Sequence, residues 1–253
     1  MESQKTASSD FGSLFSAIPN FLLTLLYPQS CQICEKSVES KTDGFVCGDC
    51  WRETQIFDGK EIICQKCGAF LKNGSTDSEV FCHRCQEDEY DSARSVGLYE
   101  KALAVSILNL KIQPYIPRTL QKFICDSFKN SPFQDADLII PVPLAERRRL
   151  ERGFNQAAVI SRIISKSNDL PFDEISLKRI VHTEKHRAGM DKKSRAESVE
   201  NAFEVKRPRL VENKNILLVD DVFTSGATVS GCAKVLKKSG ANKVYVFTVA
   251  RAF

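Results

Sequence analysis

Eight of the ten cysteines form four Cys-x2-Cys pairs, and their spacing restricts what this chain can fold into more than any other feature. Such a turn places two thiolates at two corners of a tetrahedron, so two turns complete a four-thiolate zinc site. Four pairs therefore predict two structural zinc sites. The simplest assignment is sequential, but the spacing also allows an interleaved one. The predicted ligands are Cys31, Cys34, Cys47, Cys50, Cys64, Cys67, Cys82 and Cys85.

Disulfide bonds, a redox pair and an iron–sulfur cluster are the alternatives to zinc. The gaps of 12, 13 and 14 residues between the pairs are nearly even, which is unusual for a disulfide scaffold. An iron–sulfur cluster also uses four cysteines, and the spacing leaves it open. The segment is too small and polar to bury a core of its own, so bound metal must supply much of its folding energy. Four sulfurs leave no open coordination position, and we expect no metal catalysis.

The composition is that of a soluble globular protein: 253 residues, 42% hydrophobic and 27% charged, with a net charge of +4. The chain has no run of about 18 apolar residues, so no membrane-spanning helix is expected. Residues 1–27 include an apolar stretch that Pro19 interrupts. The stretch lacks the basic start and cleavage site of a secretory signal, so we expect an amphipathic segment.

A buried strand is predicted at 216–219, where four aliphatic residues follow one another without polar alternation. Apolar residues at helical spacing from Val229 to Leu236, and a further apolar run at 243–249, complete a βαβ unit. Open parallel sheets bind ligands at the carboxyl ends of their strands. Asp220 and Asp221, directly after the first strand, are therefore expected at a ligand-binding edge.

The polar segment between this strand and helix is suited to bind phosphate. Free backbone N–H groups and the positive end of the helix dipole favour an anion there, and Gly226 permits close backbone approach. Two neighbouring carboxylates can accept hydrogen bonds from vicinal ribose hydroxyls or act through a divalent ion. The segment lacks the Gly-Lys-Ser/Thr of a Walker loop, and aspartates that only cap a turn are the plainest alternative. The candidate residues are Thr224, Ser225, Gly226, Ala227 and Thr228.

The order of residues 216–228 resembles the 5-phosphoribosyl-1-pyrophosphate (PRPP) signature of type I phosphoribosyltransferases. The resemblance implies that Asp220 and Asp221 are the catalytic positions and hold the ribose 2′- and 3′-hydroxyls. It also implies that residues 224–228 hold the 5′-phosphate, with Mg²⁺ accompanying PRPP.

A second buried strand is predicted at 137–144, where an apolar run ends in a proline-fixed loop. In the phosphoribosyltransferase layout the pyrophosphate loop follows a strand in this place and acts through backbone amides. Pro141 and Pro143 carry no N–H, so Val142, Leu144 and Ala145 would have to donate.

An arginine-rich loop at 147–152 follows, and a helix begins beyond it with Asn155 as its expected N-cap. A charged run is usually a solvated face. Because this one follows the predicted phosphate-binding loop, anion contact is an equal alternative. Arg147 and Arg152 are the candidates to bind pyrophosphate or a nucleic-acid backbone.

Residues 182–195 are polar and basic and lie between a predicted strand at 175–181 and a predicted short helix ending at Phe203. Such a segment is either a surface excursion or a mobile lid. Type I phosphoribosyltransferases have a flexible loop in this place that closes over PRPP, so the resemblance implies a lid. Its candidates for phosphate contact or catalysis are His182, His186, Arg187, Lys193 and Arg195.

The pattern from about residue 28 to residue 251 resembles the competence protein ComF family. The residues that carry the resemblance are the four cysteine pairs, Pro141-Val142-Pro143, Arg152-Gly153-Phe154-Asn155-Gln156, Asn201-Ala202-Phe203 and 219–228. The resemblance implies a role in DNA uptake and natural transformation, with single-stranded DNA and a DNA helicase as partners. In the lid the chain departs from the family, which often has Gln in place of His186.

We therefore expect an α/β fold, a type I phosphoribosyltransferase-like parallel sheet flanked by helices, with an N-terminal double zinc ribbon. The expected divisions are an amphipathic segment at 1–27, the double zinc ribbon at 28–89 and the phosphoribosyltransferase-like domain at 90–253. Further helices are predicted at 101–111 and 116–129.

Two functions fit this pattern. The first is a transferase that moves ribose 5-phosphate from PRPP, with Mg²⁺, to an unidentified acceptor. The second is a PRPP-binding protein of DNA uptake, whose basic loops contact phosphate backbones. The chain ends at Phe253 directly after a predicted strand, so any hood over an acceptor is expected from residues 97–130. A phosphorylated ligand and reduced thiols both fit the cytoplasm.

Overall fold

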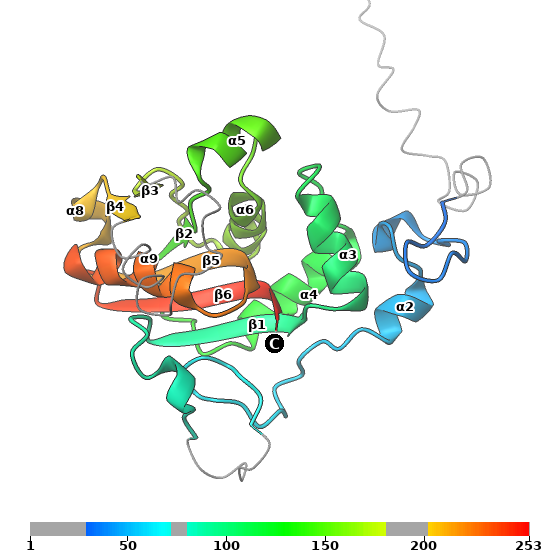
Figure 1. The fold of residues 1–253 in the computed structure, drawn as a ribbon, viewed down its shortest axis with the longest axis horizontal. Coiled ribbons are helices and arrows are strands. Elements are labelled where there is room, and N and C mark those ends of the chain that lie inside the picture. The colour runs from blue at the N-terminus through cyan, green and yellow to red at the C-terminus, as the bar shows by residue number, and fades with distance from the viewer. Residues whose placement is uncertain (1–28, 72–79, 181–201, 253) are drawn as a thin grey trace, which may run out of the picture.

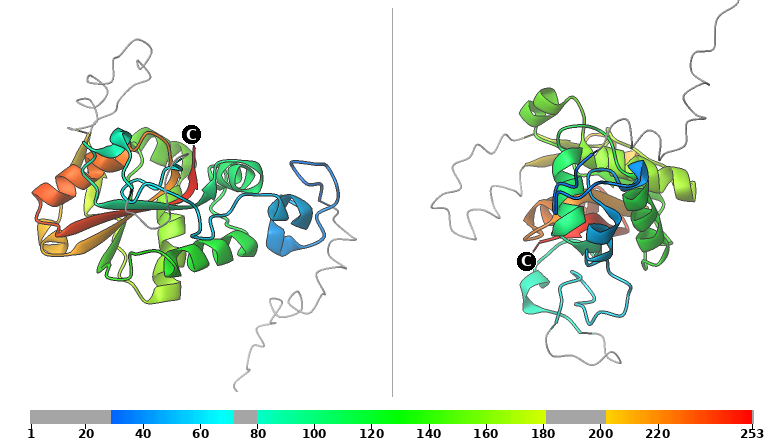
Figure 2. Two further views of the ribbon diagram at one scale, coloured as in Figure 1. Left: turned by 90° about the horizontal axis from the view of Figure 1, so that it is seen from below. Right: turned by 90° about the vertical axis from the view of Figure 1, so that its right-hand side faces the viewer.

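The computed structural model describes residues 29–71, 80–180 and 202–252 (Figures 1 and 2). Its centre is a four-stranded parallel sheet in the order β1-β6-β5-β2. The strands are β1 (Ser92–Leu98), β6 (Lys243–Arg251), β5 (Asn215–Phe223) and β2 (Leu138–Pro141). The predicted parallel sheet is thereby confirmed. Its two middle strands are continuous apolar runs because both of their faces are buried.

Helices cover both faces of the sheet. One face packs on α3 (Lys101–Leu110), α4 (Arg118–Lys129) and α6 (Gln156–Asn168), whose buried residues share one core with Leu217 and Val219 of β5. The other face packs on α9 (Ala227–Lys238), which shares a second core with Ile216 and Leu218. Successive residues of β5 thus face different helices, as the pleat of a strand requires.

The predicted helices were close to the observed ones, but two expectations were wrong. The arginine-rich segment is a helix, α5 (Glu146–Arg152), and not a loop. Its residues are good helix formers, an Arg147–Glu151 ion pair spans one turn, and Gly153 ends it in a left-handed conformation. Phe203 does not end a helix, because β4 (Phe203–Val205) pairs antiparallel with β3 (Leu177–Arg179). A four-residue helix, α8 (Pro208–Val211), precedes β5.

The cysteine-rich region forms two small modules, the first packed against α3 and α4 and the second against the β1 edge of the sheet. The first ribbon, residues 29–54, contains the 3-10 turn η2 (Lys41–Asp43) and the helix α2 (Gly48–Arg52). Its Trp51 ring lies 5.7 Å from Phe123 of α4, so this ribbon contributes to the core under α3 and α4. The second ribbon, residues 62–71 and 80–88 with the turn η3 (His83–Cys85), shares the core under α9.

Residues 55–57 join the two ribbons along the outer edge of β1. Ile56 bridges Gly97, and the Phe57 N–H donates to the Val96 carbonyl. The join is close, because a Cβ on Gly97 would lie 2.3 Å from the Gln55 carbonyl oxygen. The linker therefore covers the edge of the sheet that β1 would otherwise leave unpaired.

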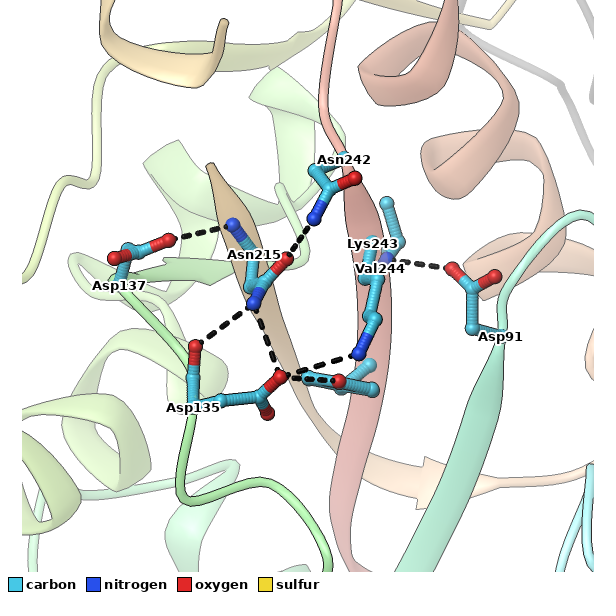
Figure 3. A network of polar contacts seen from close by, with 8 residues as sticks. Asp91, Asp135, Asp137, Asn215, Asn242, Lys243 and Val244 are labelled. Carbon is cyan, nitrogen blue, oxygen red and sulfur yellow. Dashed lines mark hydrogen bonds and ion pairs between the residues drawn. The ribbon is translucent and has the colours of Figure 1, made fainter. Parts of the chain in front are cut away.

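A polar network ties the strands together at the amino-terminal edge of the sheet (Figure 3). The Asp135 carboxylate accepts hydrogen bonds from Asn215 of β5 and from Lys243 and Tyr245 of β6. Asp91 accepts from the Val244 backbone N–H in the same way. This edge lies opposite the carboxyl ends of the strands and leaves those ends to the candidate site.

Candidate functional site

Asp220 and Asp221 lie near the carboxyl end of β5, and their side chains are close enough to interact directly. Asp221 shares its face with α3, where its Oδ2 lies 3.6 Å from the Lys111 Nζ. Burial, together with the negative charge of Asp220, raises the pKa of the Cys232 thiol of α9 well above its usual value. The Asp221 backbone N–H donates to Asp220 Oδ1 at 2.8 Å. One ligand at the end of this strand can therefore use both carboxylates.

The environment of Asp220 disfavours its ionisation. Burial, together with the neighbouring negative charge of Asp221, raises the pKa of Asp220 well above its usual value, and the Lys111 cation opposes the shift. Asp220 is therefore placed to lose its proton when a cation approaches. Perturbed carboxylates of this kind are typical of functional sites.

Lys111 is a site residue that the sequence analysis missed. It follows α3 directly and belongs to the segment expected to supply a hood. Its side chain is 32% exposed and that of Asp221 is 18% exposed, so the pair borders solvent without being fully hydrated. The one sequence signal that could have indicated Lys111 as a site residue was its position just after a buried helix of the hood segment.

The predicted phosphate loop connects β5 to α9. Thr224 and Ser225 are exposed, and Gly226 has φ of +79° directly before the first turn of α9. A Cβ on Gly226 would lie 3.0 Å from Phe223 Cζ, so the backbone passes close over that ring. The loop thus presents the first amides of a twelve-residue helix and two exposed hydroxyls at the same edge as the acidic pair.

β2 brings the expected pyrophosphate loop to the same edge, because Pro141 pairs with Val219, the residue before Asp220. The Val142 N–H, however, donates to the Val219 carbonyl at 2.8 Å. Val142 is therefore not available as the predicted anion donor, since its amide belongs to the sheet. Asn155 fixes the same residue from the other side by donating to the Val142 carbonyl at 3.0 Å.

The other residues predicted for this region follow Val142 in the chain. Leu144 and Ala145 form the turn into α5, and α5 carries Arg147 and Arg152. The Arg147 side chain is 82% exposed and pairs with Glu151, whereas Arg152 is partly buried at the end of the helix. Asn155 caps α6 as expected, accepting a hydrogen bond from the Ala157 N–H at 3.1 Å.

The eight paired cysteines gather into two clusters in sequential order. In the first, Cys31–Cys50 and Cys34–Cys47 sulfurs lie 3.9 and 3.6 Å apart. In the second, Cys64–Cys85 and Cys67–Cys82 sulfurs lie 3.6 and 3.5 Å apart. Four sulfurs at the ~2.3 Å zinc–sulfur distance of a tetrahedral site lie about 3.8 Å from one another. Both clusters fit zinc.

Two sets of predicted residues lie outside the described ranges. They are the N-terminal amphipathic segment and the lid candidates at 182–195. In the part of the chain that the structure does describe, no helix has the length and apolar character needed to cross a membrane.

Comparison with known proteins identifies the family. Residues 22–86 match the double zinc ribbon domain, and residues 150–252 match the phosphoribosyl transferase domain. Competence protein F of Haemophilus influenzae is 32% identical over 234 residues, which cover 88% of this chain and 90% of that protein. The chain belongs to the competence protein F family. The resemblance noted from the motifs and the expected fold class are confirmed.

Two other relatives carry related names. DNA utilization protein YhgH of Escherichia coli strain K12 is 28% identical over 235 residues, covering 90% of this chain and 99% of that protein. Competence protein ComFC of Bacillus subtilis is 26% identical over 224 residues, covering 80% and 89%. The family's members are thus similar along almost their whole length, ribbons and sheet together.

Among solved structures, glutamine PRPP amidotransferase from B. subtilis, complexed with ADP and GMP, is 18% identical with a TM-score of 0.37, over 55% of this chain and 30% of that chain. A score this low adds no argument. The fold assignment rests on the observed strand order and on the family match.

Proposed function

We propose that this protein binds PRPP together with Mg²⁺ at the carboxyl end of β5 and acts in the uptake or use of external DNA. The observation that carries the proposal is the placement of two carboxylates and a glycine-containing helix start at one edge of a phosphoribosyl transferase sheet. The names of the family's relatives, competence protein and DNA utilization protein, support the second half.

The residues at this edge fit the chemical groups of PRPP. The exposed hydroxyls of Thr224 and Ser225, with the first amides of α9, suit the 5′-phosphate. Asp220 and Asp221 suit the ribose hydroxyls. Mg²⁺ prefers carboxylate and phosphate oxygens, so the acidic pair and the pyrophosphate of PRPP would hold it. Bound there, the ion would neutralise charge on the pyrophosphate.

Calorimetric titration of PRPP, with and without Mg²⁺, tests the binding site. We expect wild type to bind PRPP in a Mg²⁺-dependent way, and Asp221→Asn to weaken binding at least tenfold. Asp135→Asn is the matched control, because it changes an aspartate at the opposite edge of the same sheet. Undetectable binding to wild type, or equal weakening by both variants, would refute the proposed site.

An active transferase is the second candidate, and Lys111 favours it. This cation stands in the hood segment facing the acidic pair, where an acceptor or the departing pyrophosphate would lie. Incubation of wild type and Lys111→Met with PRPP, Mg²⁺ and a panel of nucleobases and small acids tests this function. Acceptor-dependent pyrophosphate release that Lys111→Met reduces would establish a transferase. Binding of PRPP without release for any acceptor would leave a sensor or scaffold.

Contact with single-stranded DNA is proposed for the face of α5. Arg148 and Arg149 are exposed there beside Arg147, and the same helix carries two glutamates, Glu146 and Glu151. Arg148→Ala/Arg149→Ala is expected to weaken oligonucleotide binding and to reduce its salt dependence. Lys36→Ala/Lys60→Ala, which also removes two exposed cations, is the control. Binding that is absent, or unaffected by salt, would remove the DNA-contact proposal.

We place the protein in the cytoplasm, because two sets of reduced thiolates and a phosphorylated metabolite both belong there. Fractionation of cells that express the tagged protein tests this location. Recovery in the periplasmic fraction would contradict it.

A further inference from the structure

The second cysteine cluster lies directly beside the phosphate loop. Cys67 is in contact with Arg251, the last residue of β6, whose guanidinium donates to the Cys67 carbonyl and lies 3.7 Å from the Cys67 sulfur. Arg251 is buried, so its charge is not dispersed by solvent. The thiolates of a bound zinc site carry net negative charge, and this cation is placed to offset it.

The same arginine reaches the phosphate loop through Phe223. Its guanidinium carbon lies 4.5 Å from the centroid of the Phe223 ring, a close cation–π contact. Phe223 is the last residue of β5 and immediately precedes the loop. Its ring supports the backbone of Gly226, where an added Cβ would lie 3.0 Å from Phe223 Cζ.

A second connection runs from the ribbon to the start of α9. Tyr90 stands edge-on to Phe223 at 6.0 Å and donates to the Asp88 carboxylate at 2.7 Å. The Glu89 N–H donates to the Ser230 hydroxyl in the first turns of α9 at 3.0 Å. Lys66, between two ligand positions, donates to the Asp88 carbonyl at 2.7 Å. Ribbon and loop are therefore joined on both sides of Phe223.

We propose that Arg251 is a positioning residue that couples the second zinc site to the sugar-phosphate site, so that occupancy of either stabilises the other. The inference rests on the proposed PRPP site. Coupling is reciprocal: if zinc orders the loop for phosphate, bound phosphate must slow the loss of that zinc by the same contacts. The first zinc site, packed under α3 and α4, lacks this connection among the described residues and should not respond.

Zinc release from the full chain into excess chelator tests the coupling, with and without Mg²⁺ and PRPP. Trp51 is the chain's one tryptophan and lies in the first ribbon, so the kinetic phase that changes its emission belongs to the first site. We expect PRPP to slow the other phase about tenfold or more in wild type. Arg251→Gln should remove this protection while still binding PRPP, though more weakly.

Arg94→Gln is the matched control. Arg94 is also an arginine that holds the second ribbon, through the Gln65 carbonyl at 3.0 Å, but its described contacts do not include Phe223. PRPP should still protect the second zinc in this variant. Arg251→Lys, which keeps the charge without the planar stacking group, should restore zinc retention more than it restores protection by PRPP.

Parallel calorimetry separates the failure of this inference from that of the proposed function. If wild type binds PRPP but releases both zinc ions at unchanged rates, or if Arg251→Gln is protected as well as Arg94→Gln, the coupling is wrong. If wild type binds no PRPP, the proposed site fails. In that case, hydrogen exchange in Cys67→Ser tests whether the second zinc site orders the phosphate loop. Faster exchange at residues 222–228 would support this link, and unchanged exchange would overturn it.

Discussion

Asp220 and Asp221 are adjacent in the chain and both respond to Lys111, but in different ways. Asp221 forms an ion pair with Lys111, whereas Asp220 is the carboxyl whose pKa burial and the Asp221 charge raise. Placing two partly buried carboxylates side by side is unfavourable without a ligand, and such an arrangement is typical of sites that a ligand completes. The two residues should therefore differ in what their substitution does to stability and binding.

Asp220→Asn is expected to stabilise the unliganded protein at neutral pH and to weaken PRPP binding. The folded-state pKa of Asp220 is raised, so the folded state holds a proton that the unfolded state has lost. Its contribution to the free energy of unfolding therefore falls as pH rises from the unfolded pKa through the folded one. The variant should melt about 2–4 °C higher, the shift that about 1 kcal/mol produces in a chain of this size. Melting curves at pH 4.5 and 7.5 check this, and an unchanged or lower melting temperature at pH 7.5 would contradict it.

Gly226→Ala should destabilise the native conformation of the phosphate loop and should weaken phosphate binding. The residue has φ of +79°, where an L side chain costs about 1–2 kcal/mol, and its Cβ would press on Phe223. Gly153→Ala is the control, because Gly153 also has positive φ but a Cβ there meets nothing within 4 Å. Both variants should lose stability by chemical denaturation. Equal PRPP affinity in the two would show that the loop does not bind the phosphate.

For single residues, the sequence was enough to predict the site residues that directly follow a strand. It was not enough for site residues that tertiary packing brings in from distant parts of the chain. Asp220, Asp221 and Gly226 follow an apolar run, so strand period and turn chemistry locate them. Lys111 comes from a distant helix end, and local pattern contains no sign of its partner. Val142 was wrong as an anion donor because its hydrogen bond to Val219 depends on how β2 pairs with β5.

Among the elements, buried strands and amphipathic helices were predictable because each has its own periodicity. α5 was not predictable in this way, because a run of arginines has no apolar face. The only sequence signals for this helix are the helix propensity of its residues and Gly153, which ends it. β4 was missed because a three-residue strand is defined by its partner β3 and not by its own pattern.

The ribbons are elements whose folding we expect to depend on metal, and Trp51 reports on the first of them. Its indole N–H donates to the Asp43 carbonyl at 2.9 Å, and it is 5% exposed. Cys50→Ser should therefore shift Trp51 emission to longer wavelength, as chelation should in wild type. Cys85→Ser, the equivalent change in the second ribbon, should leave the emission unchanged. Identical spectra for the two variants would contradict separate folding of the ribbons.

In the whole molecule, sheet and ribbons form one packed unit that local sequence could not reveal. Trp51 packs on Phe123, and Arg251 contacts Cys67, a residue 184 positions away. The sequence predicted the two modules from cysteine spacing and strand pattern, but contacts over such separations depend on tertiary packing. The first ribbon therefore packs against the hood segment, and the second against the phosphate loop.

The Asp135 network at the far edge should stabilise the sheet without affecting the site. Partial burial would raise the pKa of Asp135, but hydrogen bonds from Tyr245 and Lys243 hold it below the usual value. Its contribution is present above the unfolded pKa and is lost as pH falls through the folded one. Asp135→Asn should lower the free energy of unfolding by at most about 1 kcal/mol at pH 7, and the difference should vanish in acid. Urea denaturation from pH 7 to pH 3 measures this, and a difference that persists in acid would contradict it.

Hydrogen exchange of the full, zinc-loaded chain with and without Mg²⁺ and PRPP locates the ligand on the chain and so tests the proposed site. PRPP should protect the amides at 223–229, where the loop enters α9, and Asp221→Asn should reduce this protection while Asp135→Asn should not. Binding that leaves these amides unprotected, or protects a different edge of the sheet, would contradict it.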